Sequence, residues 1–399
     1  MIAAPMVSGM LRCAATMGAV LLWCHGAGGG AAAAPGDLPV CRTNLARQLR
    51  TLDVPGLAAT IVKNGRLVCA AAAGMANIEQ EQPATPDTLF LIASVSKTIT
   101  ATALMQLRDQ GRFRLDDDVN AHLPFRVSVP AAPATPITFR QLLTHTASIA
   151  DNTKYINCPG SCAYGSSLNA FVTRGADSPI SLGDLTRGYL TPGGPYYDPI
   201  ANFKPGAPGT IADYSNMGTV LAGYLVEVIS GVPFDQYTKD HIFTPLGMST
   251  TSWRLRGIDR SILAMPYDKG PSGFMPYGQY GEPDYPDGML RTSAKELGYF
   301  LGAYMQSGGH NRHRILKPAT VREMLKRQSP LDRAQGLVWV SQSIDRRPVW
   351  GHDGSDNGAG AQMWFDPASG DGVILMTNGM WIDDDGALLA ELFHEAGRY

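Results

Sequence analysis

Residues 90–97 read FLIASVSK, and the rest of the chain can be interpreted outward from the Ser94-x-x-Lys97 spacing inside them. The apolar start of this stretch leads Ser94 toward residues 98–110, where apolar side chains recur at helical spacing until Gly111 ends the pattern. Ser94 and Lys97 then share one helix face. A neighbouring amine can take the proton of a serine hydroxyl and make it a nucleophile. The spacing therefore favours a Ser-Lys nucleophile pair, although an N-capping serine before a solvated lysine gives the same pattern.

The composition is that of a globular protein. Of the 399 residues, 44% are hydrophobic and 17% are charged, and the formal net charge is −2. This length allows two or three domains, or one large unit with an insertion. The charge balance gives no reason to expect a nucleic acid or an anionic membrane surface as a partner.

The first 34 residues predict a secretory signal. Arg12 supplies a positive end, residues 14–23 are apolar, and residues 26–34 are small and offer an A-x-A cleavage site. A retained anchor is the alternative, but the apolar run is short for a bilayer span. We therefore expect a mature chain from about Pro35 that is periplasmic or secreted and has no membrane span.

Export places the remaining cysteines in an oxidising compartment, where an even number predicts disulfides. We expect the pairs Cys41-Cys69 and Cys158-Cys162, which are one of three possible connectivities. The Cys158-x3-Cys162 spacing has no second cysteine or histidine pair nearby, so a metal site is not predicted. No feature of the sequence calls for a metal, a nucleotide or another cofactor.

Strand-like segments lie at both ends of the chain, with a helical middle between them. Residues 56–62 and 67–73 flank Asn64-Gly65, a strong hairpin signal. Short β-rich runs return at 335–342, 347–351, 360–365 and 372–377, before a helix at 384–394. Helices are predicted at 138–143, 217–230, 234–241, 294–306 and 318–328.

This order predicts an α+β fold in which both ends of the chain build one antiparallel sheet. Within a domain at 35–399, we expect a sheet lobe at about 45–115 and 331–399 and a mostly helical lobe at about 116–330. A site would lie in the groove between the two lobes. The stretch 149–208 is predicted as one long loop, either an ordered lid or solvated decoration.

Two further motifs carry polar side chains. Tyr214-Ser215-Asn216 precedes an apolar helix, where a phenol beside a cation can shuttle protons and Ser215 or Asn216 can cap the helix. His352-Asp353-Gly354-Ser355 follows a strand. Gly354 would let backbone approach a ligand, a strand edge can offer an N–H to an oxyanion, and His352 would face the groove as a cation or hydrogen-bonding group. Either motif alone is also compatible with a capped helix or an unremarkable turn.

Taken in order, S-x-x-K, Y-x-N and H-x-G resemble the serine hydrolases related to class C β-lactamases and penicillin-binding proteins. Residues 111–119 (GRFRLDDDV) and 137–146 (ITFRQLLTHT) also look like signatures of this family. The resemblance covers about residue 45 to the end of the sequence. It implies a β-lactamase/transpeptidase-like fold, with an antiparallel sheet flanked by helices and an inserted, mostly helical lobe.

The resemblance also implies residue roles. Ser94 would be the acylated nucleophile, Lys97 its activating base and Tyr214 the proton shuttle, while Asn216 would orient Lys97 or the substrate amide. The oxyanion hole would be formed by the backbone N–H groups of Ser94 and Ser355, the residue that follows His352-x-Gly354. Lys97 and Tyr214 titrate as a coupled pair, so the base at each step stays open.

Two departures from the family pattern affect the expected substrate. Class C β-lactamases carry Lys-Thr-Gly where this chain has His352-Asp353-Gly354, a form commoner among the family's esterases and peptidases. Ala147-Ser148 also replaces the usual Ser-Gly after Thr-His-Thr. The resemblance therefore implies an exported serine hydrolase that acts on a small ester, peptide or β-lactam-like substrate.

We expect cleavage of an ester or amide through a Ser94 acyl-enzyme. The first alternative is a D-Ala-D-Ala carboxypeptidase or D-aminopeptidase-type enzyme that acts on peptidoglycan fragments, and the second is a class C-like β-lactamase. A non-catalytic penicillin-binding or cell-wall-binding protein is the alternative from another class.

Overall fold

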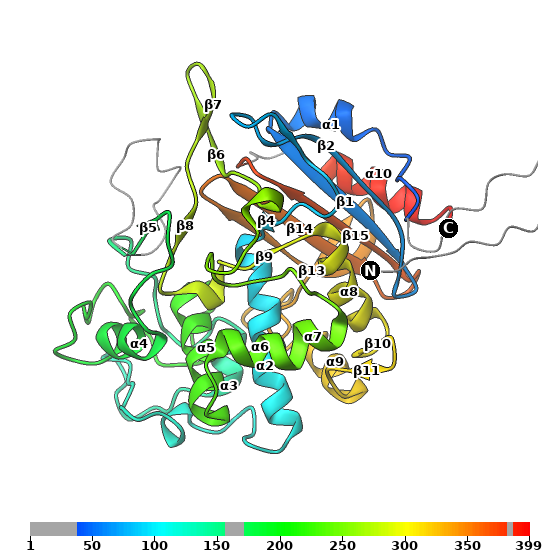
Figure 1. Ribbon diagram of the computed structural model, residues 1–399. Helices are drawn as coiled ribbons and strands as arrows, with labels where there is room; N and C mark the ends of the chain where they lie inside the picture. The colour runs from blue at the N-terminus through cyan, green and yellow to red at the C-terminus, as the bar shows by residue number, and fades with distance from the viewer. Residues whose placement is uncertain (1–37, 156–170, 381–385) are drawn as a thin grey trace, which may run out of the picture. The chain divides into compact units, whose positions relative to one another are not determined.

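A seven-stranded antiparallel sheet forms the centre of the fold (Figure 1). The computed structural model describes residues 38–155, 171–380 and 386–399. The strands of the sheet, in spatial order, are β12 (Val340–Ile344), β13 (Arg347–Asp356), β14 (Ala359–Asp366), β15 (Asp371–Thr377), β1 (Gly56–Lys63), β2 (Arg66–Asn77) and β3 (Gln82–Pro83). Because β1 pairs with β15, segments from both ends of the described chain build one sheet, as predicted.

The remaining elements form the helical part and several small ribbons. The helices are α1 (Leu45–Leu52), α2 (Ser96–Asp109), α3 (Phe139–Leu143), α4 (Leu182–Leu190), α5 (Asn216–Ser230), α6 (Phe234–Thr238), α7 (Thr244–Leu246), α8 (Ala294–Met305), α9 (Pro318–Met324) and α10 (Gly386–Ala396). The short strands are β4 (Phe90–Leu91), β5 (Thr173–Arg174), β6 (Tyr267–Gly270), β7 (Gly273–Pro276), β8 (Tyr280–Gly281), β9 (Arg291–Thr292), β10 (Gly309–His310) and β11 (His313–Arg314).

Both faces of the sheet are covered. Helices α1 and α10 lie on one face, and α8 packs against β1, β2 and β15 on the other (Figure 1). Side chains of β1 alternate between these faces: Leu57 and Ile61 join the cluster beneath α10, whereas Ala58 and Val62 join the larger core. The uninterrupted apolar run of β1 thus serves two cores.

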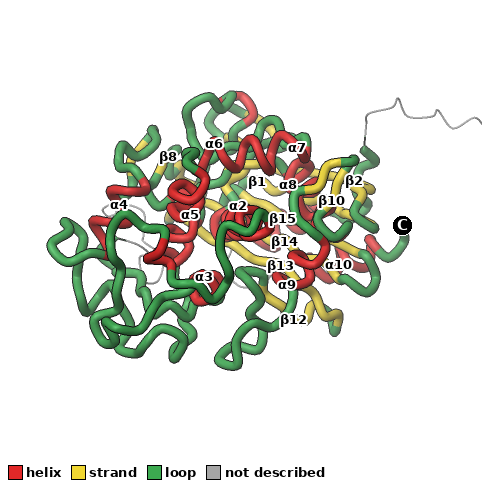
Figure 2. The backbone as a smooth tube through the Cα atoms, turned by 90° about the horizontal axis from the view of Figure 1, so that it is seen from below, coloured by secondary structure: helices red, strands yellow, loops and turns green. Residues whose placement is uncertain are grey.

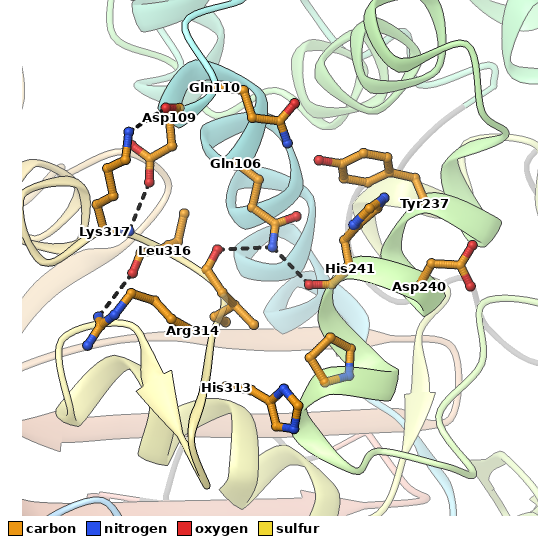
Figure 3. Close-up of a pocket in the computed structure, with 12 residues that line it drawn as sticks. Gln106, Asp109, Gln110, Tyr237, Asp240, His241, His313, Arg314, Leu316 and Lys317 are labelled. Atoms are coloured by element: carbon orange, nitrogen blue, oxygen red, sulfur yellow. Dashed lines mark hydrogen bonds between the residues drawn. The ribbon is translucent and has the colours of Figure 1, made fainter.

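Helix α2 is buried on all sides from Ser96 to Leu107. Figure 2 shows it between α5 and the strands of the sheet. Its Gln106 amide donates hydrogen bonds to the carbonyl oxygens of His241 (2.9 Å) and Ile315 (3.0 Å), beside a cavity of about 470 Å³ (Figure 3). These hydrogen bonds anchor the C-terminal end of α2. They therefore help to fix the position of its first turn, which lies at the candidate site described below.

Within the described residues, no single helix is long and apolar enough to cross a bilayer. Judged by length and composition alone, helix α5 and the following segment Phe234–Leu246 are together long and apolar enough for a span, but the chain bends by 81° between them.

Several predicted elements differ from the observed ones. Helix α2 begins at Ser96 rather than at 98, and β12 occupies Val340–Ile344 rather than 335–342. Val338 adopts a positive φ of 68°, which a β-strand does not allow, and it interrupts the predicted run. The register of β12 is instead set by the turn at Asp345-Arg346, whose φ angles of 47° and 63° are those of a tight hairpin.

The prediction of one long loop at 149–208 was wrong in its described part, because it contains α4 and β5. The Ser181 hydroxyl accepts the N–H of Asp184 and caps α4, whose Leu182, Leu185 and Tyr189 are buried. The surrounding glycines and prolines hid this short helical period. The predicted Cys158-Cys162 pair lies outside the described residues.

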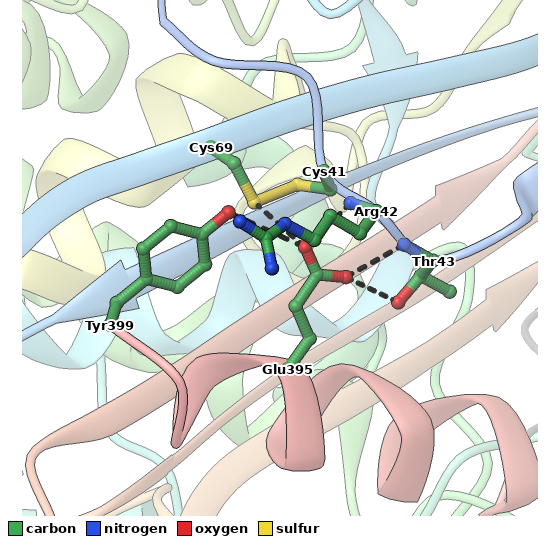
Figure 4. The surroundings of a disulfide bond; sticks show 6 residues. All are labelled: Cys41, Arg42, Thr43, Cys69, Glu395 and Tyr399. Carbon is green, nitrogen blue, oxygen red and sulfur yellow. Dashed lines mark hydrogen bonds between the residues drawn. A yellow bond between two sulfur atoms is a disulfide. The ribbon is translucent and has the colours of Figure 1, made fainter.

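The predicted Cys41-Cys69 disulfide is present (Figure 4). Beside it, the Glu395 carboxylate of α10 accepts hydrogen bonds from the N–H groups of Arg42 (2.6 Å) and Thr43 (2.7 Å) and from the Thr43 hydroxyl (2.6 Å). The disulfide closes 28 residues of sequence, and this loop-closure entropy corresponds to about 3–4 kcal/mol of stability. The segment before α1 is therefore attached covalently to β2 and by hydrogen bonds to α10.

We expect Glu395→Gln to lower the free energy of unfolding by about 2 kcal/mol at neutral pH, because three donors lose an ionised acceptor. Burial opposes ionisation of Glu395, but the Thr43 and Arg42 donors outweigh it and lower its pKa. A depressed pKa gives stability that is present above the unfolded pKa and lost as pH falls through the folded pKa.

Urea unfolding of wild type and Glu395→Gln at several pH values would measure this difference. It should narrow as the solution becomes acidic. Glu81→Gln, the same change at an exposed glutamate away from α10, is the matched control. If the difference in unfolding free energy between wild type and Glu395→Gln did not change with pH, Glu395 would not be ionised in the folded protein.

Candidate active site

Ser94 lies in a short 3-10 turn, Ala93–Val95, directly before α2, and Lys97 lies in the first turn of that helix. The Lys97 side chain is 0% exposed, and its Nζ donates hydrogen bonds to Ser94 Oγ and to the Asp287 carbonyl oxygen, both at 2.8 Å. The predicted pairing of Ser94 and Lys97 is thus present as a direct contact.

Ser96, the other serine of the stretch, is fully buried. Its Oγ accepts the N–H of Leu290 at 3.2 Å, which ties α2 to the segment before β9. Ser96 therefore has a structural partner, whereas the Ser94 hydroxyl is held by an amine.

Tyr214 completes a group of three with Ser94 and Lys97. Lys97 Nζ lies 5.0 Å from the centroid of the tyrosine ring, and the phenol interacts with the side chains of both Lys97 and Ser94. Tyr214 is 43% exposed, so part of its ring faces solvent. The next residue, Ser215, caps α5 by accepting the N–H of Gly218, as one of the two predicted capping options.

The N-terminus of α5 also holds a carboxylate. Asp151 accepts the N–H groups of Asn216 (2.9 Å) and Met217 (3.0 Å), and the Asn216 side chain interacts with it as well. A helix N-terminus favours a negative charge at this position. The negative charge of Asp151 in turn stabilises the Lys97 ammonium. Among the described contacts, Asn216 therefore affects Lys97 indirectly, by binding Asp151.

Strand β13 lies against Ser94 at Gly354. A Cβ atom on Gly354 would lie 2.5 Å from the Ile92 carbonyl oxygen and 2.8 Å from the Ser94 nitrogen, closer than real contacts allow. Only glycine permits this approach of strand and turn. The sequence predicted that Gly354 would let the backbone approach a ligand; the close neighbour in the structure is the turn that carries Ser94.

Ladder alternation gives the direction of the Ser355 N–H. Asp356 and Ala359 flank the two-residue turn to β14, so Asp356 and Gly354 bond to β14 and Ser355 points to the opposite edge. There β12 begins only at Val340, opposite Gly351, and leaves the edge at Ser355 unpaired by β12. The N–H groups of Ser94 and Ser355 are thus suited to a shared oxyanion.

His352 is 3% exposed, and its Nδ1 lies 2.5 Å from the Asp353 carbonyl oxygen. Nδ1 therefore carries the proton and donates it. Burial lowers the pKa of His352, and the Lys97 ammonium lowers it further, although Asp353 opposes both. Of the two predicted forms of this side chain, the geometry favours the neutral hydrogen-bonding group over the cation.

Lys97 and Tyr214 act electrostatically on each other, and Lys97 is the fully buried member of the pair. Burial alone would lower the pKa of Lys97, but Tyr214 and the carboxylates of Asp287 and Asp151 outweigh it and raise the pKa. Burial raises the pKa of Tyr214, and the nearby Lys97 opposes that rise. The resting pair is thus an ammonium beside a neutral phenol, and Lys97 becomes a base only after it loses a proton.

Asp287 is a site residue that the sequence did not reveal. Its Oδ2 lies 3.7 Å from Lys97 Nζ. Burial, with Asp151 and Asp356, raises the pKa of Asp287 to about 7, although the Lys97 ammonium lowers it. Asp287 ends a short 3-10 turn, Tyr285–Asp287, that carries no sequence periodicity or motif, so only the three-dimensional structure reveals its contact with Lys97.

Comparison with known proteins gives one family. A sequence model described as Beta-lactamase matches residues 42–397. Penicillin-binding protein 4 of Amycolatopsis lactamdurans is 27% identical over 339 residues, which are 82% of this chain and 81% of that protein. Protein flp of Staphylococcus aureus (strain MW2) is 26% identical over 65% of this chain, which spans only 47% of that protein.

Among solved structures, the D-amino acid amidase of Ochrobactrum anthropi SV3 has a TM-score of 0.67 and 21% identity. The match covers 89% of this chain and 95% of that one. At this identity the similarity establishes the fold alone, an antiparallel sheet with helices, as predicted.

We expect Gly354→Ala to slow the reaction of Ser94 with a fluorophosphonate probe by at least about 100-fold, because the new Cβ pushes β13 away from the Ser94 N–H. The labelling rate, followed by intact mass, is the measurement. Gly386→Ala is the matched control, since a Cβ there meets no atom within 4 Å. Equal labelling rates in the two variants would show that this approach is unimportant.

We expect Asp287→Asn to move the pH dependence of Ser94 labelling to lower pH by about one unit. Removing a negative neighbour destabilises the Lys97 ammonium, lowers its pKa and makes the neutral amine available at lower pH. The labelling rate measured across pH tests this shift. Asp240→Asn, the same chemical change at an exposed position, should leave the profile in place; a shift of the Asp287→Asn profile to higher pH would refute the coupling.

Proposed function

This chain belongs to the beta-lactamase family of serine hydrolases, and we propose that it cleaves an ester or amide bond through an acyl-enzyme on Ser94. The observation that carries the proposal is the 2.8 Å hydrogen bond from the fully buried Lys97 ammonium to Ser94 Oγ. A lysine is rarely buried without a specific role for its charge.

The proposed reaction has two steps. The reacting form is the Lys97–Tyr214 pair that has already lost one proton to solvent. Ser94 Oγ attacks the carbonyl carbon while this deprotonated pair takes the serine proton, and the N–H groups of Ser94 and Ser355 bind the oxyanion. The pair then gives a proton to the leaving alcohol or amine. In the second step a water molecule loses a proton to the pair, attacks the acyl carbon and releases the acid, and Ser94 recovers its proton.

Esters and peptides are the preferred substrates in this proposal. The third motif is His352-x-Gly354, and a neutral histidine offers no fixed cation for the carboxylate of a lactam. A β-lactamase activity and a non-catalytic cell-wall-binding role are the remaining alternatives. We also propose export, because the predicted signal at 1–34 agrees with the Cys41–Cys69 disulfide, a bond typical of oxidising compartments.

A second candidate narrows the substrate to amides whose acyl group carries a free amine. The carboxyl groups of Asp151, Asp287 and Asp356 all interact electrostatically with Lys97, and burial raises the pKa of each, so the negative field that they produce grows as the pH rises. Such a field favours a substrate ammonium. One of the solved structures of similar fold is that of a D-amino acid amidase, which makes D-amino acid amides the first compounds to test.

We expect Ser94→Ala to lower hydrolysis of a p-nitrophenyl ester by at least about 1,000-fold, because no other group can form the acyl-enzyme. Ser96→Ala is the control within the same stretch and should keep the chemistry while losing some stability. Hydrolysis by Ser94→Ala at the wild-type rate would refute the proposal.

A parallel panel of the ester, nitrocefin, a D-Ala-D-Ala peptide, D-phenylalanine amide and its N-acetyl form ranks the substrates. If the second candidate holds, D-phenylalanine amide, which has a free amine, is cleaved faster than its N-acetyl form. Equal rates for the two amides would remove it.

A further inference from the structure

His145 lies just after α3 and holds the backbone on both sides of Tyr214. Its carbonyl oxygen accepts the N–H of Asp213 at 2.9 Å, and its Nδ1 accepts the N–H of Ser215 at 3.2 Å. One residue thus bonds to the positions immediately before and after the phenol. The family signature at 137–146 includes His145, but the proposed reaction gives it no role.

The His145 ring also lies against the Tyr214 ring. The two ring centroids are 4.5 Å apart with planes inclined by 31°. His145 is 6% exposed, whereas Tyr214 is 43% exposed, so the phenol has a fixed neighbour on one side and solvent on another. Contacts with His145 therefore replace much of the packing that a buried tyrosine would have.

The protonation state of His145 follows from its bonds. Because Nδ1 accepts a hydrogen bond, the proton is on Nε2, which has no partner among the described residues. Burial, followed by the Lys97 ammonium, lowers the pKa of His145 to about 3. The ring is thus neutral at any pH at which the enzyme works, and it adds no positive charge beside Lys97.

The backbone of His145 is in an unusual conformation. Its φ is +54°, a left-handed value that is uncommon outside glycine, although asparagine, aspartate and histidine adopt it more often than other residues. This conformation directs its carbonyl oxygen and its ring to the same segment. Glycine or asparagine would adopt this φ at a lower cost, so the contacts of the histidine side chain must offset the strain in its backbone.

We propose that His145 is a positioning residue that holds the Tyr214 hydroxyl between Ser94 and Lys97 through the Ser215 N–H and its own ring. The inference rests on the proposed function only in giving Tyr214 the proton-shuttle role. The charged or titratable groups that face Tyr214 are Lys97, Asp287 and His352, and His145 acts on none of them by changing its own charge.

The test compares His145→Asn with His145→Gly. Both residues accept a positive φ, but only asparagine offers an acceptor, Oδ1, at the same number of bonds from the backbone as Nδ1. We expect the glycine variant to lose about 100-fold in kcat with KM within twofold, and asparagine to recover most of that loss. Urea midpoints of both variants separate this effect from a loss of folding.

A double-mutant cycle with Tyr214→Phe identifies the partner. If His145 acts through the phenol, His145→Gly adds little further loss in the Tyr214→Phe background. Equal losses in both backgrounds, or an asparagine variant as slow as the glycine variant at equal stability, would overturn the inference. If the glycine variant does not fold, His145→Gln replaces it, because its oxygen lies one bond too far out.

The outcome is separable from that of the proposed function. Wild type and Ser94→Ala are assayed first, and their ratio alone decides whether Ser94 is the nucleophile. If no substrate of the panel is cleaved, the same cycle is read from the rate of Ser94 labelling by the fluorophosphonate. Rates of labelling that follow the pattern above support the positioning role, and additive losses refute it.

Discussion

A charged amine without access to water is the constraint on which this structure depends. Lys97 is 0% exposed, and moving an ammonium out of water is costly unless hydrogen bonds and opposite charges surround it. Two hydrogen bonds and the carboxylate of Asp287 meet that need. They come from a turn and a loop almost 200 residues apart, so the site can form only when the helical part and the sheet are both in place.

Much of this arrangement could be predicted from periodicity and spacing. The Asn64-Gly65 hairpin, the pairing of terminal segments into one sheet and the Ser94-Lys97 contact follow from local patterns that the structure retains. The Cys41–Cys69 bond belongs to the expected one of the three connectivities that the cysteine count allowed. Each of these features depends on few residues, which lie near one another in sequence or belong to strongly patterned strands.

The remaining features had no local signal. Asp287 reaches Lys97 from a 3-10 turn of three residues, and its carbonyl oxygen, which any residue would supply, makes the shorter contact. Val338 interrupts a run with ideal strand composition, because a positive φ is not visible in residue type. His145 belonged to a recognised signature, yet its contacts with both neighbours of Tyr214 depend on backbone direction. Tertiary contacts, rather than propensity, decide such positions.

The pairing of β1 with β15 determines when the central sheet can form during folding. Strand β1 ends at Lys63, and the strand that completes its pairing begins at Asp371, so this ladder joins the two strands of the sheet that are separated by most of the described chain. Contacts of this separation form late and slowly. Until then β1 is an apolar edge open to other chains, a hazard for a nascent polypeptide. Assembly of the sheet must therefore follow synthesis of nearly the whole chain, and a chaperone that shields β1 would raise the yield of folded protein.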